Sequence, residues 1–163
     1  MKIAAEKIVT FRLGDELFAA EVQSVERVLR YTAPRTVPNM PDWVDGVIEY
    51  QQKVVPVVDL RRRFNLPPLE DMAGARTLVV SSAGEWVGLV VDAVDEVGAF
   101  DVKELQPPPA FFKGLAGEYL RGLLRRKDRL VILLDVDRLL SATERLALET
   151  ATGAAGAGAA RDA

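Results

Sequence analysis

Two pairs of segments in this 163-residue chain repeat each other, and this repetition constrains the fold more than any other feature. FAAEVQSVERV (18–28) and VGLVVDAVDEV (87–97) carry valines at matching places. GVIEYQQKVVPVVDL (46–60) and GLLRRKDRLVILLDV (122–136) each run through glycine, an apolar run, a polar turn, a second apolar run and aspartate. The alternative is chance similarity among valine-rich strands. A true repeat predicts two half-domains of about 65 residues, too small to be robust alone but able to bury a shared core.

The apolar runs are short, rich in valine and bounded by turn residues, which favours strands over helices. They lie at 8–13, 17–22, 47–50, 54–60, 77–80, 86–91, 119–124 and 130–136. Gly14-Asp15 and Ala83-Gly84 separate paired runs and fit hairpin turns. The sequence therefore predicts a mainly β domain.

Helical signals are few. Single turns are expected at 60–64 and 137–140, each after one of the two matching strands. Ser141 and Glu144 form a capping-box pattern that predicts a short C-terminal helix. The Ala/Gly-rich segment 151–163 has little to bury and is expected to be a disordered tail.

Composition removes several common kinds of reaction centre. The chain has no cysteine and no histidine, which excludes disulfides, thiolate or imidazole metal sites and nucleophiles that need a histidine. The formal charge of −3 gives no overall attraction for nucleic acid. No signal segment opens the chain, and no window approaches the roughly 18 apolar residues that span a bilayer. We expect a soluble, cytoplasmic protein without metal or cofactor.

Two aspartates, Asp59 and Asp135, end the two strongest strands. A pair of carboxylates can serve as general acid and base or bind Mg²⁺. The favoured interpretation is that each caps the turn that follows it, because the two occupy equivalent repeat positions and no third polar group joins them.

Arginines cluster at Arg61, Arg62 and Arg63 and again between Arg121 and Arg129. Small β-barrels do bind single-stranded nucleic acid, but that mode needs aromatic side chains interleaved on the same face. Only Phe64 and Tyr119 lie near these clusters in the sequence. A solvated charged face is therefore favoured, and nucleic-acid binding stays the alternative function.

The repeated Val-x-x-Val-x-x-Val spacing does not fit one regular strand, in which alternate residues share a face. Each segment is expected to bend from one strand through a turn into the next. The valines are interpreted as core in the first place, and as an apolar docking surface in the second.

In this order and spacing, several segments resemble the chemotaxis coupling proteins, the CheW family, and the related regulatory domain of the CheA histidine kinase. They are FRLGDELFAAEV with VERV, VPNMPDWVDGVI, VVPVVDLRRRF, VGLVVDAVDEV, LQPPPA, EYLRGLL and LVILLDVDRLL. The resemblance covers about 8–148. Without a kinase phosphate-binding sequence or a phosphorylatable histidine, the chain is similar to the free adaptor and not to the kinase.

The resemblance implies two SH3-like five-stranded β-barrels that share a hydrophobic core. The half-domains are expected at about 8–70 and 75–140, with strands that can be intertwined. It also implies a noncatalytic adaptor that binds a CheA-type kinase regulatory domain and chemoreceptor cytoplasmic tips. Through these partners the adaptor is expected to be recruited to membrane receptor arrays.

By resemblance, the receptor-binding candidates are Val25 and Val28 together with the hairpin Glu49, Tyr50, Gln51 and Lys53. The family commonly reads Asn-Leu-Arg-Gly where this chain reads Glu-Tyr-Gln-Gln at 49–52. Gln51 thus replaces the arginine expected to contact the receptor, and Glu49 replaces the asparagine, a shift of two charge units toward negative. Receptor coupling of the usual kind is in question.

Gln52 stands where the family has a turn glycine. A positive φ there would strain a glutamine, so we expect the hairpin to be reshaped around Gln52 and Lys53. For the kinase, the repeat indicates the bend equivalent to the one at Val25 and Val28. The candidate contacts there are Val91, Val94 and Val97.

Overall fold

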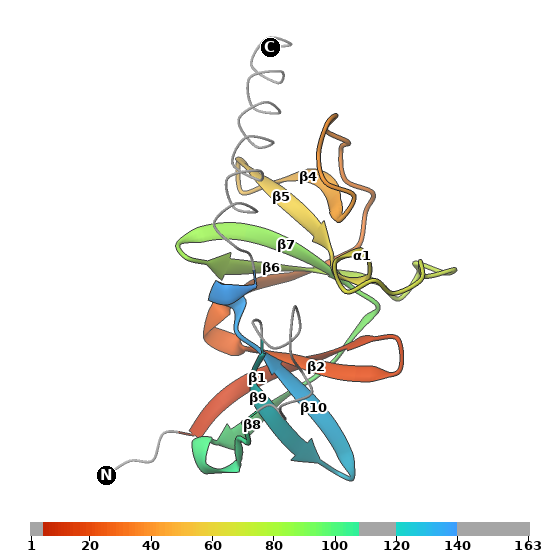
Figure 1. Cartoon of the computed structure of the whole chain (residues 1–163). Helices are drawn as coiled ribbons and strands as arrows, with labels where there is room; N and C mark the ends of the chain where they lie inside the picture. The colour runs from red at the N-terminus through yellow and green to blue at the C-terminus, as the bar shows by residue number, and fades with distance from the viewer. Residues whose placement is uncertain (1–4, 108–119, 140–163) are drawn as a thin grey trace.

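The computed structural model describes residues 5–107 and 120–139, and within them the chain forms ten strands (Figure 1). The strands are β1 (Ala5–Leu13), β2 (Glu16–Glu21), β3 (Val25–Arg30), β4 (Val44–Tyr50), β5 (Lys53–Asp59), β6 (Arg76–Ser82), β7 (Glu85–Val91), β8 (Ala93–Asp101), β9 (Leu120–Arg126) and β10 (Arg129–Leu134). The short helices are η1 (Val22–Ser24), α1 (Leu60–Arg63), η2 (Val102–Glu104) and η3 (Val136–Arg138). The expected C-terminal helix at Ser141 and the tail at 151–163 lie outside the described residues.

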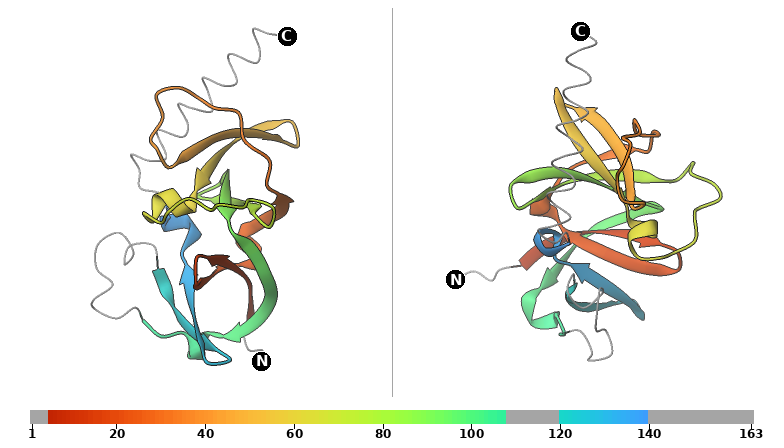
Figure 2. Two further views of the ribbon diagram at one scale, coloured as in Figure 1. Left: turned by 90° about the vertical axis from the view of Figure 1, so that its right-hand side faces the viewer. Right: turned by 45° about the horizontal axis from the view of Figure 1, so that its top comes forward.

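The strands make two five-stranded sheets, and each sheet takes strands from both halves of the sequence. Sheet A has the order β8-β1-β2-β10-β9, and sheet B has the order β3-β6-β7-β5-β4. Strand for strand the two orders are equivalent, with β3 in the place of β8 and the hairpin β6-β7 in the place of β1-β2. The first half therefore gives its opening hairpin to sheet A and its remaining strands to sheet B, as Figures 1 and 2 show. The predicted mainly β fold with two five-stranded units is confirmed.

A β-bulge explains the spacing of the last two valines in each repeated segment, Val25 to Val28 and Val94 to Val97. Val25 pairs with Val80 and Arg27 with Val79, so Glu26 is an extra residue in β3. The register of β8 on β1 shifts at the equivalent place, between Val94 and Glu96. One extra residue lets positions three apart share a face, which a regular strand forbids. The predicted bend is confirmed, and the bulge adds the local cause.

The repeated segments 46–60 and 122–136 each begin with a glycine, Gly46 and Gly122. At both positions another segment of the chain crosses so closely that a side chain would not fit. A Cβ on Gly46 would lie 2.3 Å from the Arg35 carbonyl oxygen, and one on Gly122 would lie 2.7 Å from the Gln106 carbonyl oxygen. The crossing segments are held by paired backbone hydrogen bonds, Arg35 with Val47 and Gln106 with Leu123. These crossings cover β4 and β9, which are the edge strands of their sheets.

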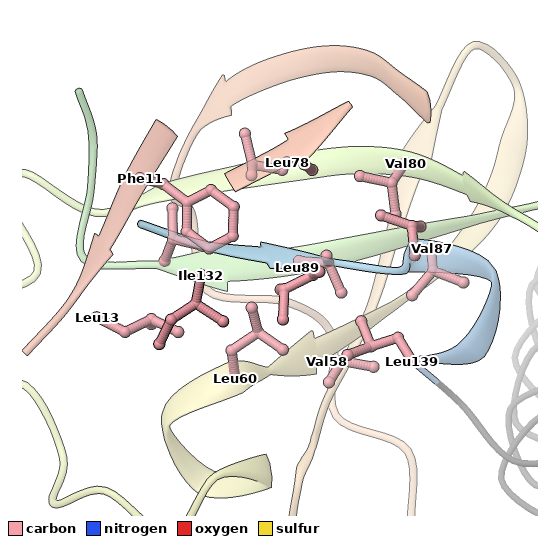
Figure 3. Packing of buried hydrophobic residues seen from close by; sticks show 14 of the residues in the cluster. Phe11, Leu13, Val58, Leu60, Leu78, Val80, Val87, Leu89, Ile132 and Leu139 are labelled. Atoms are coloured by element: carbon pink, nitrogen blue, oxygen red, sulfur yellow. The ribbon is translucent and has the colours of Figure 1, made fainter. Parts of the chain in front are cut away.

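Alternation along the strands divides the apolar side chains among three cores. The largest lies between the two sheets (Figure 3) and includes Phe11 and Ile132 from sheet A with Leu78, Val87 and Leu89 from sheet B. A second core, around Leu17, Phe100 and Leu133, belongs to sheet A alone. A third, around Tyr50, Val55 and Val79, belongs to sheet B alone. Neighbouring residues such as Leu78 and Val79 thus enter different cores, as a period of two requires.

Three stacked rings in and beside the central core also tie the sheets together. Phe11 and Phe18 of sheet A have ring centroids 6.1 Å apart, and Phe18 lies 5.8 Å from Phe64, which follows α1 of sheet B. Offset stacking at these distances adds about 0.5–1.5 kcal/mol per pair to area burial.

Candidate partner-binding surfaces

The two strand-ending aspartates are caps. Asp59 accepts hydrogen bonds from the backbone N–H of Arg61 (3.0 Å) and Arg62 (3.3 Å) at the start of α1. Asp135 accepts from the N–H of Asp137 (3.2 Å) at the start of η3. Capping, the favoured interpretation, is confirmed. In the part of the chain that the structure describes, no three Asp or Glu side chains form a group suited to a metal ion.

The arginines of the first cluster contact other groups of the protein, and Arg62 stays exposed. Arg61 makes a bidentate pair with Asp92, with Nε 2.7 Å from Oδ1 and Nη2 2.6 Å from Oδ2. Arg62 pairs with Asp59 at 3.4 Å. Arg63 is 7% exposed and lies over the Trp43 ring, 5.9 Å from its centroid. Each of these three side chains is therefore engaged by another group of the protein.

The second cluster is partly consumed in the same way. Arg121 bridges Glu6 and Glu21 across strands of sheet A. Arg126 reaches the Ala99 carbonyl oxygen at 3.0 Å and Glu104 at 3.4 Å. The Arg126 contacts join β9 to β8, the two strands at opposite ends of the order of sheet A, and the Arg121 pairs join β9 to β1 and β2. The nucleic-acid alternative finds no support in this arrangement.

Asp92 lies at a junction of both sheets. Besides Arg61 it accepts a 2.7 Å hydrogen bond from the Gly14 N–H in the β1-β2 turn. Burial, the largest single influence, raises the pKa of Asp92, but the bonds from Arg61 and Gly14 and the guanidinium charge outweigh it, so the pKa is lowered. The hydrogen bond to Asp92 correspondingly raises the pKa of Arg61. The equivalent turn of the other half is held by Asp137, which accepts from the Ala83 N–H at 2.8 Å.

The six repeated valines grade from buried to exposed. Val91 is 1% exposed and belongs to the central core, so its side chain has no surface to offer a kinase; its nomination as a contact is corrected. Val25 and Val94 are half-buried and pack against the same core. Val28 on β3 and Val97 on β8, at equivalent repeat positions, are 39% and 63% exposed. Each therefore lies open on the edge strand of its sheet.

The β4-β5 hairpin keeps a tight two-residue turn. Tyr50 pairs with Lys53, and Gln51 and Gln52 take φ values of 48° and 66°. The expectation that the hairpin is reshaped around Gln52 and Lys53 is therefore wrong. Both glutamines accept the left-handed backbone because the two strands fix the turn geometry, and Lys127 and Asp128 do the same in the β9-β10 turn.

Glu49, Gln51 and Lys53 are exposed, whereas the Tyr50 ring is 9% exposed and belongs to the inner core of sheet B. The ring lies 5.1 Å from Trp86 between centroids, and Lys53 Nζ lies 5.1 Å above Trp86. At this end of sheet B, the Tyr50 and Trp86 rings form an aromatic pair, and cationic side chains such as Lys53 lie at its rim.

Sequence reasoning missed two residues of this rim, Arg27 and Trp86. The Arg27 guanidinium carbon lies 6.0 Å from the Tyr50 ring centroid. The missing signal was the bulge: once Val25 and Val28 are placed on one face, Glu26 and Arg27 must turn to the other, where Tyr50 lies.

Comparisons with known proteins agree with this geometry. The chain matches the family model for the CheW-like domain over residues 7–144. It is 31% identical to the chemotaxis protein CheW of Klebsiella aerogenes over 147 residues, covering 88% of this chain and 89% of that protein. Protein FrzA of Myxococcus xanthus is 30% identical, covering 88% and 90%.

Among solved structures, the scaffolding protein TtCheW from Thermoanaerobacter tengcongensis matches with a TM-score of 0.79 at 27% identity. The match covers 88% of this chain and 92% of that chain. None of the helices in the described ranges, 5–107 and 120–139, has the length and apolarity to span a membrane.

Proposed function

The chain belongs to the CheW-like domain family, and from this premise we propose that it is a noncatalytic chemotaxis adaptor coupling a CheA-type histidine kinase to chemoreceptors. The observation that carries the proposal is the family match over 7–144, joined to the structural likeness to a scaffolding protein. Its site of action is the cytoplasm, where its partners recruit it to membrane receptor arrays.

An adaptor needs two separate surfaces and no reaction centre. A micromolar contact corresponds to about 8 kcal/mol, which a modest interface with a few apolar anchors supplies. Val28 and Val97 supply one exposed anchor on the edge strand of each sheet. The two anchors lie on the edge strands of different sheets, and we assign one partner to each.

We assign the receptor to the edge formed by Val25 and Val28 with the hairpin from Glu49 to Lys53. We assign the kinase regulatory domain to Val94 and Val97. Exposure supports Val28 and Val97 most directly, because an exposed side chain can be changed without opening the core.

The test is a binding experiment with two probes, the regulatory domain of a CheA-type kinase and a soluble chemoreceptor-tip fragment. Val97→Asp is expected to weaken kinase binding and Val28→Asp receptor binding, each by tenfold or more for a lost hot-spot contact, about 1.4 kcal/mol. Each variant is the matched control for the other. If wild type binds neither probe, the adaptor function is refuted; if both variants bind as wild type does, the two assigned edges are refuted.

A further inference from the structure

The β4-β5 hairpin, whose sequence differs from that of the family, has the guanidinium of Arg27 beside it, supplied by β3. Glu49 and Gln51 leave the β4-β5 turn without an arginine. Arg27 of β3 reaches the same place from across the barrel, with its guanidinium carbon 6.0 Å from the Tyr50 ring centroid. Gln51 Nε2 donates to the Tyr50 hydroxyl at 3.4 Å, so Gln51 and Arg27 meet at one ring.

The β3 bulge aims Arg27 at this ring. Arg27 pairs with Val79, whose side chain lies in the inner core of sheet B, and cross-strand partners share a face. The extra residue, Glu26, turns the same way and accepts a long 3.5 Å hydrogen bond from the Tyr50 hydroxyl. Tyr50 is itself fixed, at 9% exposure, against Trp86. The guanidinium therefore rests on a rigid support while Arg27 stays exposed.

We propose that Arg27, supported on Tyr50, is the residue that binds a carboxylate of the chemoreceptor helix, in place of the arginine that the family carries at position 51. The proposal rests on the function proposed above. A planar guanidinium grips a carboxylate with two parallel hydrogen bonds, and stacking on an aromatic ring preorganises it. An acidic side chain on the partner fits this site, and a basic one does not.

The lack of an acidic partner for Arg27 in the described part of the chain favours this assignment. No ion pair joins Arg27 to a carboxylate within the described residues, whereas Arg61, Arg121 and Arg126 all have acidic partners on the protein. Glu49 on the exposed hairpin repels a partner carboxylate that approaches position 51. Glu26 at the Tyr50 hydroxyl repels the partner carboxylate in the same way, so the attraction at this ring must come from the guanidinium of Arg27 itself.

The test measures binding of a soluble chemoreceptor-tip fragment and, separately, of the kinase regulatory domain. Arg27→Glu is expected to weaken receptor-tip binding by at least tenfold and to leave kinase binding unchanged. Arg27→Lys keeps the charge but not the fork, and is expected to fall between wild type and Arg27→Glu. The wild-type affinity for the tip is expected to fall with added salt more steeply than that of Arg27→Glu.

The matched control is Arg125→Glu, which makes the same charge change at an exposed position of β9 in the other sheet, outside the edge assigned to the receptor. It is expected to bind both probes as wild type does. A second variant, Arg27→Ala with Gln51→Arg, is expected to regain tip binding because it returns the guanidinium to the turn.

The outcomes separate the two proposals. Equal tip affinity of wild type and Arg27→Glu overturns the assignment of Arg27 and leaves the adaptor function standing. Equal losses in Arg27→Glu and Arg125→Glu overturn it as well, because they indicate general charge steering. If wild type binds the kinase domain but not the tip, the receptor half of the proposed function fails, and the role of Arg27 fails with it.

Discussion

Replacing Gly122 by alanine tests whether close chain crossings hold the edges of the two sheets. An added Cβ would lie 2.7 Å from the Gln106 carbonyl oxygen and 2.7 Å from Cγ and Cδ1 of Leu105. Gly122 does not have a φ in the left-handed range, so the substitution probes space alone. Ordinary contact begins near 3.4 Å, so the crossing segment must retreat by about 0.7 Å.

The expected loss of stability follows from three contributions. Overpacking of this kind costs about 1–3 kcal/mol. The retreat stretches the two backbone hydrogen bonds between Gln106 and Leu123, now 2.9 and 2.8 Å, each worth about 1 kcal/mol. Alanine recovers about 0.5–1 kcal/mol because it is less flexible than glycine when unfolded. Gly122→Ala should therefore lower the free energy of unfolding by about 1–3 kcal/mol.

Urea unfolding followed by circular dichroism measures this change, and the slope against denaturant should stay constant. The control is Gly98→Ala on β8, where a Cβ meets nothing within 4 Å. Gly98→Ala should be neutral or slightly stabilising. If Gly122→Ala is as stable as Gly98→Ala, the crossing segment does not pack as described and the steric explanation is refuted.

Three further changes test other parts of the structure. Exchanging Gln51-Gln52 for Asn-Gly should raise the free energy of unfolding by about 1 kcal/mol, and the urea midpoint with it, since Asn-Gly takes the left-handed turn readily. An unchanged midpoint would contradict backbone strain at Gln51 and Gln52. Asp59→Ala should lower stability by about 1 kcal/mol through the lost cap, and Asp59→Asn should retain most of it. The lowered pKa of Asp92 means its carboxylate stabilises the fold fully above about pH 4, its unfolded pKa, and progressively less as pH falls through the folded value. Wild type should therefore lose more stability on acidification than Asp92→Asn, and parallel pH curves would argue against this.

Local signals in the sequence were enough for the elements but not for their partners. Short valine-rich runs and turn pairs predict the strands, and an aspartate at a strand end predicts a capped turn, because these depend on neighbouring residues only. Which sheet a hairpin joins depends on contacts with strands that are distant in the sequence. The hairpins β1-β2 and β6-β7 are similar in sequence, so no local pattern distinguishes pairing within a half from pairing with the other half.

The candidate sites show the same division. Val28 is exposed and Val91 is buried because the central core ends between their positions in space. Both residues are valines, so the sequence alone does not distinguish the exposed one from the buried one. Arg27 was missed because its neighbour across the barrel, Tyr50, is more than twenty residues away and is reached only through the bulge. The hairpin at Gln51 was misjudged because strand pairing on both sides imposes a turn that glutamine alone would not choose.

The exchange of strands between halves also bears on how an adaptor can hold two partners in a fixed relation. β3 follows β2 after the three residues of η1, yet β2 lies in sheet A and β3 in sheet B. β7 and β8 are divided between the sheets in the same way. Asp92 at that junction is held by Arg61 of α1, which follows β5 of sheet B, and by Gly14 in the β1-β2 turn of sheet A. Moving one sheet against the other would therefore break the central core and both junctions together. The edges carrying Val28 and Val97 belong to one rigid body, so partners bound there keep a constant spacing.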